Sequence, residues 1–189
     1  MIVRIAGAAF ALSLAAPACA AETYAIDPGH TIPAFEVIYG GFSIQRGNFS
    51  KARGKVTLDR AAASGAIDVT IDPATVSTSQ PARDELLKSD AFFDVARFPA
   101  IVFKASRMRF GGEGLVGADG ELTMLGVTRP VMLSVTGFKC GSSQLNKAVV
   151  VCGAEVAATI RRSDWGMKTG IPDVADEVRI TIPVEAVRE

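Results

Sequence analysis

Apolar and polar side chains alternate along most of this chain with a period of two residues. The alternation is clear in residues 34–39, where Phe35, Val37 and Tyr39 occupy every second position. It returns in the segments 55–59, 67–72, 101–106, 121–124, 131–136, 156–160 and 177–184. Strict alternation of this kind is typical of β-strands with one buried face. The pattern therefore predicts about eight strands.

Turn signals separate these segments and bear on how the strands connect. They lie at Gly40-Gly41, Gly111-Gly112, Asp119-Gly120 and Gly170. Short strands joined by such turns favour an all-β fold, either a sandwich or an antiparallel barrel. No repeat, low-complexity tract or linker divides the chain, so we expect one β domain over residues 21–189.

One segment, residues 79–89, carries helix signals instead. Ser79 is a candidate N-cap, Pro81 suits the first turn, and Lys88 lies near the negative end of the helix dipole. Residues 90–94, "DAFFD", are expected to add a second short turn of helix. The sequence thus predicts a short helical crossover between two strands.

This crossover is very apolar for a connection between strands. Its large apolar side chains are Leu86, Leu87, Phe92, Phe93 and Phe98. An antiparallel barrel of about eight strands has an interior that is either just filled by side chains or wide enough for one small ligand. The apolar side chains of the crossover must be buried against something, and the open end of a barrel offers apolar surface. We therefore expect the crossover to form a lid over one end of a barrel.

The first 20 residues have the features of a secretory signal peptide. Arg4 supplies the positive end, residues 5–16 form an apolar run, and Ala18-Cys19-Ala20 is a small-residue cleavage site. The apolar run is shorter than the roughly 20 residues that span a bilayer, which disfavours an uncleaved anchor. A lipoprotein attached through Cys19 is the other alternative. We expect cleavage after Ala20 and export.

The charge balance excludes some classes of partner. The full chain has 20 Lys and Arg residues and 20 Asp and Glu residues, and only Arg4 is lost with the signal peptide. The remaining chain has 19 basic and 20 acidic residues, which is a formal net charge of −1. Such a balance gives no electrostatic footprint for nucleic acid or for an acidic membrane surface. No segment after residue 20 is long and apolar enough to be an integral membrane span.

The cysteine count changes with the expected cleavage. Loss of Cys19 turns three cysteines into the pair Cys140 and Cys152, which flank a hairpin-like stretch. In an oxidising compartment, a disulfide closing a loop of this length would contribute about 3 kcal/mol of stability. Two unpaired buried thiols or a metal site are the alternatives. Metal is the poorest of the three, because the chain offers no further cysteine after cleavage and a single histidine.

The order and spacing of several segments resemble the YceI-like family of the bacterial periplasm. The segments are "YAIDPGHTIPAFEV", "ARGKVTLD", "RDELLKSDAFFDVARFP", "GELTMLGVTRPV", "RRSDWGM" and "IPDVADEVRITI". The resemblance runs over almost all of the chain after residue 20. It implies a lipocalin-like antiparallel barrel in the periplasm that binds polyisoprenoids or isoprenoid quinones. Burying a lipid tail needs no chemistry and no metal, so we expect no cofactor.

The resemblance also assigns motif positions. They fall on Asp27, His30, Arg83, Asp84, Phe92, Phe93, Asp94 and residues 162–167. Two positions depart from the family pattern, since Tyr39 stands where many members have a second histidine and Trp165 stands where phenylalanine is usual. The first departure puts in doubt any role that needs two histidines, and the second can reshape a pocket.

The candidate site is an apolar tunnel inside the barrel. An isoprenoid tail has no hydrogen-bonding groups, so its site needs only apolar walls, and each buried methylene contributes roughly 0.8 kcal/mol. We expect walls from Phe35, Val37, Tyr39, Phe103, Met124 and Leu133. We expect Phe92, Phe93, Trp165 and Met167 near the mouth or lid. The alternative is a filled barrel in which the same side chains form the core.

The charged motif residues have two interpretations. Arg83, Asp84, Asp94 and Asp164 fit turn caps and partly buried ion pairs better than contacts to a ligand head group. Arg162 is the candidate head-group contact, because a guanidinium can donate several hydrogen bonds to a quinone carbonyl or a phosphate oxygen.

His30, the single histidine, is a candidate general base or pH-sensitive contact. A structural hydrogen bond to the backbone or to Asp27 is favoured. The sequence has no G-x-S-x-G, H-E-x-x-H or haem-attachment motif, so we interpret the protein as a lipid carrier and not as an enzyme. Two alternatives stay open: an isomerase or hydrolase that acts on a bound lipid through His30 or Tyr39, and a ligand-free stress or interaction module. A homodimer is also left open.

Overall fold

The computed structural model describes residues 21–112 and 114–189. The predicted signal peptide and its cleavage site after Ala20 lie outside these residues. The strands are β1 (Glu22–Ile26), β2 (Ala34–Tyr39), β3 (Ser43–Phe49), β4 (Ala52–Asp59), β5 (Ser64–Ile71), β6 (Val76–Ser77), β7 (Ile101–Gly111), β8 (Gly114–Met124), β9 (Val127–Ser142), β10 (Val150–Arg161) and β11 (Val174–Arg188). The helical segments are η1 (Pro73–Thr75), α1 (Pro81–Lys88) and η2 (Arg162–Trp165). Every segment of alternating sequence lies in a strand, except that Asp72, the last residue of the segment 67–72, follows the end of β5.

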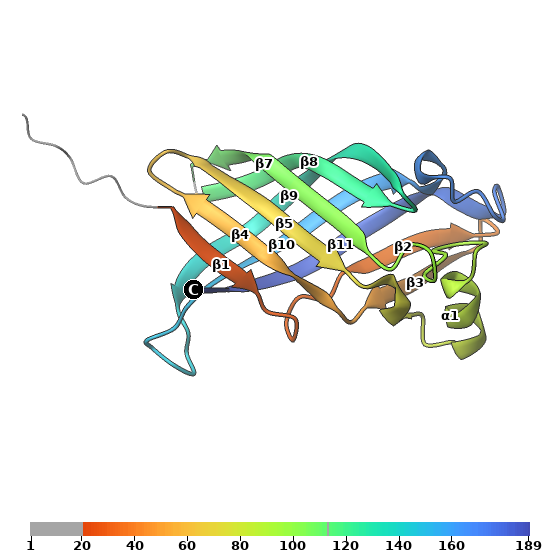
Figure 1. Ribbon diagram of the computed structural model, residues 1–189, viewed down its shortest axis with the longest axis horizontal. Coiled ribbons are helices and arrows are strands. Elements are labelled where there is room, and N and C mark those ends of the chain that lie inside the picture. Colours follow the sequence, from red (N-terminus) through yellow and green to blue (C-terminus); the bar gives the residue numbers. More distant parts are fainter. Residues whose placement is uncertain (1–20, 113) are drawn as a thin grey trace, which may run out of the picture.

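Eight strands close an antiparallel barrel (Figure 1). Their order is β1-β4-β5-β7-β8-β9-β10-β11, and β11 returns to pair with β1. The closing pair brings Tyr24 opposite Arg188 and Ile26 opposite Ala186. Closure removes the free edges that an open sheet of this size would expose. The expected all-β antiparallel barrel of about eight strands is therefore confirmed.

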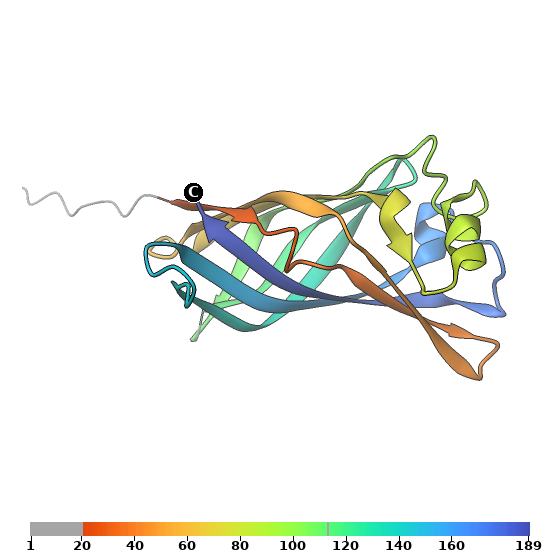
Figure 2. The same ribbon diagram turned by 90° about the horizontal axis from the view of Figure 1, so that it is seen from below.

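The long strand β11 also carries a side sheet at the other end of the barrel. Its first half pairs with β2, from Val174 opposite Tyr39 to Thr181 opposite Ala34. Strand β3 pairs with β2, and the short β6 pairs with the end of β3. Figure 2 shows that the β2–β3 hairpin extends beyond the barrel at this end.

Helix α1 and the turns after it cover the same end, and we call residues 81–98 the lid. Pro81 opens the helix as expected, but the N-cap is Gln80, whose side chain accepts a hydrogen bond from the Arg83 backbone N–H at 2.8 Å. Ser79 was the wrong cap because the chain turns sharply there, with φ of +61°. Residues 90–94 form hydrogen-bonded turns and not the expected helix.

One predicted turn was wrong. Asp119-Gly120 lies inside β8, where Gly120 faces Ala105 of β7. A side chain at Gly120 would collide with the Phe103 ring and the Lys104 carbonyl, so this glycine serves close packing. The β8–β9 turn lies instead at Leu125-Gly126, and both residues have positive φ, as a tight hairpin turn requires.

Two clusters of buried apolar side chains fill the barrel wall toward its two ends. The cluster at the lid end contains Phe49, Val76, Ile101, Phe103, Ala105, Ala118, Leu122, Met124, Val131, Ala158, Trp165 and Met167. The cluster at the opposite end contains Tyr24, Ile26, Leu58, Met108, Leu115, Val135, Cys152 and Ala186. The inward positions of the alternating strands supply most of both clusters.

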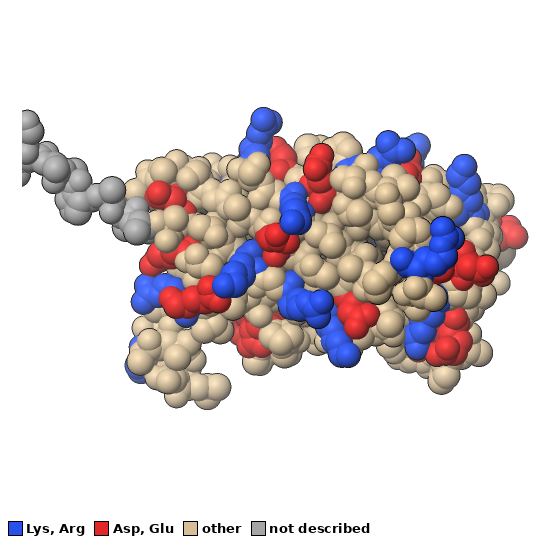
Figure 3. Space-filling model, in the orientation of Figure 1, with Lys and Arg blue, Asp and Glu red and all other residues tan. Residues whose placement is uncertain are grey.

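The outer surface mixes charges of both signs. Figure 3 shows basic and acidic side chains interspersed over the visible face, with no region of a single sign. Several are paired, such as Lys104 with Asp68 at 2.9 Å and Lys55 with Glu189 at 2.7 Å. Within the described ranges, no helix has the length and apolar character needed to cross a bilayer.

Candidate functional site

An apolar cavity of about 260 Å³ runs through the barrel. Its lining includes Leu87, Phe92 and Phe93 of the lid, and it continues to Leu115 and Cys152 in the cluster at the opposite end. Between them, the inward side chains of the strands form its walls, among them Val56, Ile67, Val69, Ile71, Leu122, Val131, Val156, Ala158, Ile180, Ile182 and Val184. Among the described residues, Arg162 supplies the only charged side chain in the lining. We call this cavity the tunnel.

Most of the expected wall residues line the tunnel. They are Phe35, Val37, Phe103, Met124 and Leu133. Tyr39 does not, because β2 extends past the barrel and leaves this side chain 55% exposed. The placement of Tyr39 in the tunnel wall was therefore wrong.

The residues expected at the mouth divide in the same way. Phe92, Phe93 and Met167 line the tunnel. Trp165 is buried beside the mouth but not in the lining, since its indole Nε1 donates a hydrogen bond to the Leu122 carbonyl at 3.0 Å. Trp165 thus fixes η2 to the barrel wall.

A row of aromatic rings connects the wall to the lid. The ring centroids of Phe35 and Phe49 lie 5.7 Å apart, and those of Phe49 and Phe93 lie 5.4 Å apart in an edge-to-face arrangement. Gly47 of β3 leaves the space that the Phe35 ring occupies. Phe49 was missed at the sequence level because β3 ("SIQRGNF") lacks clean alternation.

Polar contacts of α1 hold the lid in place. The Asp84 carboxylate Oδ1 accepts hydrogen bonds from the Thr78 backbone N–H at 2.7 Å and from its hydroxyl at 2.6 Å. These hydrogen bonds, led by the one from the hydroxyl, lower the pKa of Asp84. The Arg83 guanidinium donates to Thr78 and to the side chain of Gln45 on β3. Both charged residues are thus part of the attachment of the lid.

The guanidinium of Arg162 is bound to the backbone of the protein. It donates to the backbone carbonyls of Ala175 (2.9 Å), Met167 (3.1 Å), Thr169 (2.9 Å) and Val174 (2.7 Å). Burial lowers the pKa of Arg162, and nearby Asp176 partly offsets this effect. Four of its five N–H donors are used in this way. The main role of Arg162 is therefore to order the loop between η2 and β11, and the candidate head-group contact is not supported.

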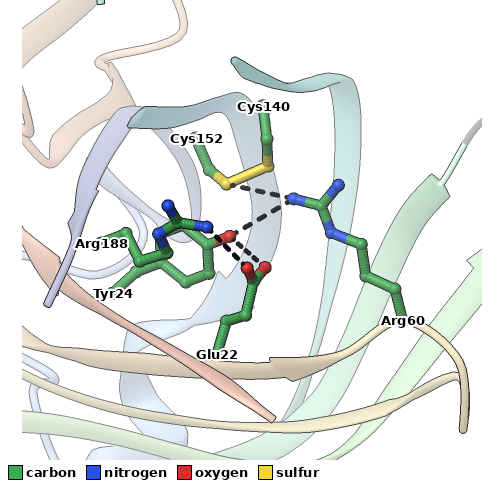
Figure 4. Close-up of a disulfide and its surroundings, with 6 residues drawn as sticks. All are labelled: Glu22, Tyr24, Arg60, Cys140, Cys152 and Arg188. Carbon is green, nitrogen blue, oxygen red and sulfur yellow. Dashed lines mark hydrogen bonds and ion pairs between the residues drawn. A yellow bond between two sulfur atoms is a disulfide. The ribbon is translucent and has the colours of Figure 1, made fainter. Parts of the chain in front are cut away.

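At the opposite end of the barrel, a disulfide and charged contacts join neighbouring strands of the wall (Figure 4). A disulfide joins Cys140 of β9 to Cys152 of β10, which face each other in register. This confirms the expected pairing. We call this end the disulfide end.

Tyr24 lies beneath the disulfide and is only 1% exposed. Its hydroxyl donates to Glu22 at 2.7 Å, and Glu22 also accepts from Arg188 at 2.8 Å. Burial raises the pKa of Tyr24, and the bond from its hydroxyl lowers the pKa of Glu22. The Arg60 guanidinium lies 3.4 Å from the Tyr24 hydroxyl and 3.7 Å from the Cys152 sulfur.

His30 lies on the outside, away from the tunnel lining. Its Nδ1 is 2.7 Å from the Asp27 carboxylate, which confirms the favoured structural hydrogen bond. This contact raises the pKa of His30 and lowers that of Asp27. Asp27, His30 and Glu185 have ligand atoms within 4.8 Å of one another, and they form the one group of metal-ligand type side chains found among the described residues. All three are at least partly exposed.

Comparison with known proteins identifies a family profile over nearly the whole barrel. The profile of the YceI-like domain matches residues 24–186. Protein YceI from Escherichia coli is 30% identical over 181 residues, which are 94% of this chain and 93% of that protein.

Solved structures agree with the fold. The Campylobacter jejuni YCEI protein is 26% identical, with a TM-score of 0.67 over 78% of this chain and 87% of that one. A polyisoprenoid binding domain from Saccharophagus degradans has a TM-score of 0.65 at 14% identity, over 88% of this chain and 98% of that one. At 14% identity this second likeness concerns the fold alone.

Proposed function

Because the chain belongs to the YceI-like family, we propose that it is an exported binding protein that carries one long-chain isoprenoid, isoprenoid quinone or similar amphiphilic lipid. The observation that carries this proposal is the apolar tunnel, which has Phe92 and Phe93 at its lid. The S. degradans domain shares this fold and is a polyisoprenoid binding domain, which supports a ligand of this class.

The tunnel suits a hydrocarbon chain and little else. Its walls are mostly side chains of Val, Ile, Leu, Met and Phe, and Arg162, the one charged member among the described residues, has most of its donors bonded to the backbone. An apolar cavity of about 150 Å³ already stays dry and binds a benzene-sized molecule. The tunnel, at about 260 Å³, exceeds that volume. Each methylene taken from water into it contributes roughly 0.8 kcal/mol, so a tail of several isoprene units would be retained.

The geometry favours a carrier over an enzyme that acts on a bound lipid. The candidate acid–base groups for such an enzyme were His30 and Tyr39. Neither side chain lines the tunnel, and both are exposed on the outside of the molecule. A proton donor or acceptor must lie within hydrogen-bond reach of the reacting group, and these two residues do not reach the tunnel contents.

The periplasm is the compartment that we propose. Disulfides persist in oxidising compartments such as the periplasm, and the Cys140–Cys152 bond is formed in this protein. The predicted signal peptide in residues 1–20 supports the same assignment.

Native mass spectrometry of protein purified from a periplasmic extract without detergent tests the proposal. We expect one lipid per protein, released by organic solvent and identified as an isoprenoid or a similar amphiphile. A protein that is empty and takes up neither quinones nor polyprenols would falsify the carrier proposal and favour a ligand-free module. A released lipid that differs chemically from the cellular pool would favour the enzyme.

A further inference from the structure

The β2–β3 hairpin has an apolar tip that the barrel leaves uncovered. We define the hairpin tip as residues 38–44. Four of its side chains are strongly exposed: Ile38 at 51%, Tyr39 at 55%, Phe42 at 97% and Ile44 at 48%. Figure 2 shows the hairpin projecting away from the barrel at the lid end. Exposed apolar patches of this kind mark sites of interaction with proteins or membranes.

The backbone holds these side chains outward. Ile38 pairs directly with Ile44 across the two strands, so both side chains lie on one face of the hairpin. The Phe42 N–H donates to the Tyr39 carbonyl at 3.1 Å, and the Gly40 N–H donates to the Asp173 carbonyl at 2.6 Å. The tip is therefore a defined turn that is fixed to the start of β11.

The hairpin tip is continuous with the tunnel. Phe35 and Val37 of β2 line the tunnel, and Tyr39 continues the same face of the strand outside it, whereas Ile38 lies on the opposite face. One face of β2 thus leads from the tunnel wall to the hairpin tip.

We propose that the hairpin tip docks into the surface of a lipid bilayer and brings the lid end of the tunnel against the membrane. Residues 37–45 carry no charge, whereas Glu36 and Arg46 form an ion pair at 2.7 Å at the base of the hairpin. At about 3.4 Å per residue, the strand ends Tyr39 and Ser43 lie roughly 10 Å beyond this pair, and the turn with Phe42 lies further out. Apolar groups at membrane interfaces reach depths of about 5–10 Å, so the tip fits the boundary of the acyl chains while the ion pair stays at the head groups.

A second copy of the chain is a poorer occupant of this surface. If each fully exposed side chain offers about 200 Å², the exposed fractions of the four residues amount to about 500 Å². A stable protein interface needs about 800 Å² from each partner. A bilayer needs no matching partner surface and accepts a projecting tip directly.

Sedimentation with neutral phosphatidylcholine vesicles tests the docking. We expect the wild-type protein to bind and the Phe42→Ser variant to lose at least tenfold in vesicle affinity. Leu145→Ser is the matched control, because Leu145 is 99% exposed in the loop at the disulfide end and should not matter. Absence of wild-type binding, or equal losses in both variants, would overturn the proposal. Analytical ultracentrifugation of both proteins adds a second criterion, because a wild-type dimer that Phe42→Ser dissociates would assign the tip to a second copy instead.

A role of the hairpin tip in ligand transfer rests on the proposed carrier function. Uptake of a lipid into the tunnel by two routes tests the two ideas separately. A fluorescent polyprenol is offered either in vesicles or from an ethanol stock. We expect Phe42→Ser to slow uptake from vesicles at least fivefold and to leave uptake from ethanol unchanged. Unchanged uptake from vesicles would refute the role in transfer, whereas no uptake by either route in the wild type would contradict the carrier function and leave the vesicle-binding result to decide the docking.

Discussion

The two ends of the barrel are closed by different kinds of interaction. At the disulfide end, the Cys140–Cys152 bond crosses two strands, and Tyr24 is buried beneath it and tied to Glu22. At the lid end, α1 has no fully buried residue, and closure depends on the half-buried side chains of Phe92 and Phe93. One end is therefore fastened by covalent and charged contacts, and the other by apolar packing together with the hydrogen bonds of Arg83 and Asp84 to Thr78.

This difference indicates which end can exchange a ligand. Opening the disulfide end would require wall strands to part, and the Cys140–Cys152 bond joins β9 to β10 there while the Glu22–Arg188 ion pair joins β1 to β11. Opening the lid end would expose a few apolar side chains, at a cost that a lipid tail in the same place would offset. Segments with few buried apolar contacts are those that open locally at low free energy. We therefore expect ligands to enter and leave past the lid.

The strongest test of this comparison removes the disulfide. We expect the double variant Cys140→Ser, Cys152→Ser to unfold in urea with a free energy lower by about 3 kcal/mol, because the bond constrains the unfolded chain. The same variant should release lipid at the wild-type rate under native conditions, because the lid is untouched. Stopped-flow transfer of a fluorescent lipid to acceptor vesicles measures that rate. Faster release without the disulfide would mean that this end is also an exit.

The second test places a charge in the lid. Phe93→Asp removes the ring that contacts Phe49 and puts a carboxylate against the tunnel mouth, where burial of a charge is unfavourable. We expect lipid release to accelerate at least tenfold, which corresponds to about 1.4 kcal/mol.

Leu86→Asp is the control for this lid variant. Leu86 belongs to the same lid, in α1, but its side chain is 51% exposed. It should leave release unchanged. Retention by Phe93→Asp equal to the wild type, with the fold intact by circular dichroism, would place Phe93 off the ligand path.

The barrel could be predicted from the sequence because its strands have one wet and one dry face. The alternation of apolar and polar residues predicts that Phe35, Val37 and Phe103 face inward. Because they face inward, these side chains also line the tunnel. β3 escaped prediction because most of it lies in the side sheet, where both faces are partly exposed and the pattern weakens.

Residues whose role depends on distant backbone could not be placed in this way. From the sequence, Arg162 was expected to have a guanidinium available to a ligand. The folded chain shows that this guanidinium donates hydrogen bonds to four backbone carbonyls. Tyr39 keeps the phase of the alternation but lies beyond the point where the barrel ends. Asp119-Gly120 has the composition of a turn, yet close packing against Phe103 requires the glycine within a strand. Local pattern thus predicts which face is buried, but not where an element leaves the core.

The smallest expected effect concerns the polar attachment of the lid and its dependence on pH. Asp84→Asn removes the charge that accepts two hydrogen bonds from Thr78, and we expect it to cost roughly 1 kcal/mol. In hydrogen exchange, amides of α1 should lose protection while those of β9 and β10 near the disulfide should not change. Equal loss of protection at both ends would show that the two ends do not open independently.

At low pH, the difference in stability between Asp84→Asn and the wild type should disappear. The pKa of Asp84 is lower in the folded protein than in the unfolded chain, where it is about 3.9. Its contribution to stability is therefore fully present above the unfolded pKa and is lost as the pH falls through the folded pKa. Thermal unfolding should show a constant gap between Asp84→Asn and the wild type from pH 7 to pH 5 (both well above about 3.9), and the gap should close in stronger acid. A gap that persists after Asp84 is protonated would mean that the amide disturbs the lid by its shape, and that the carboxylate charge does not hold the lid closed.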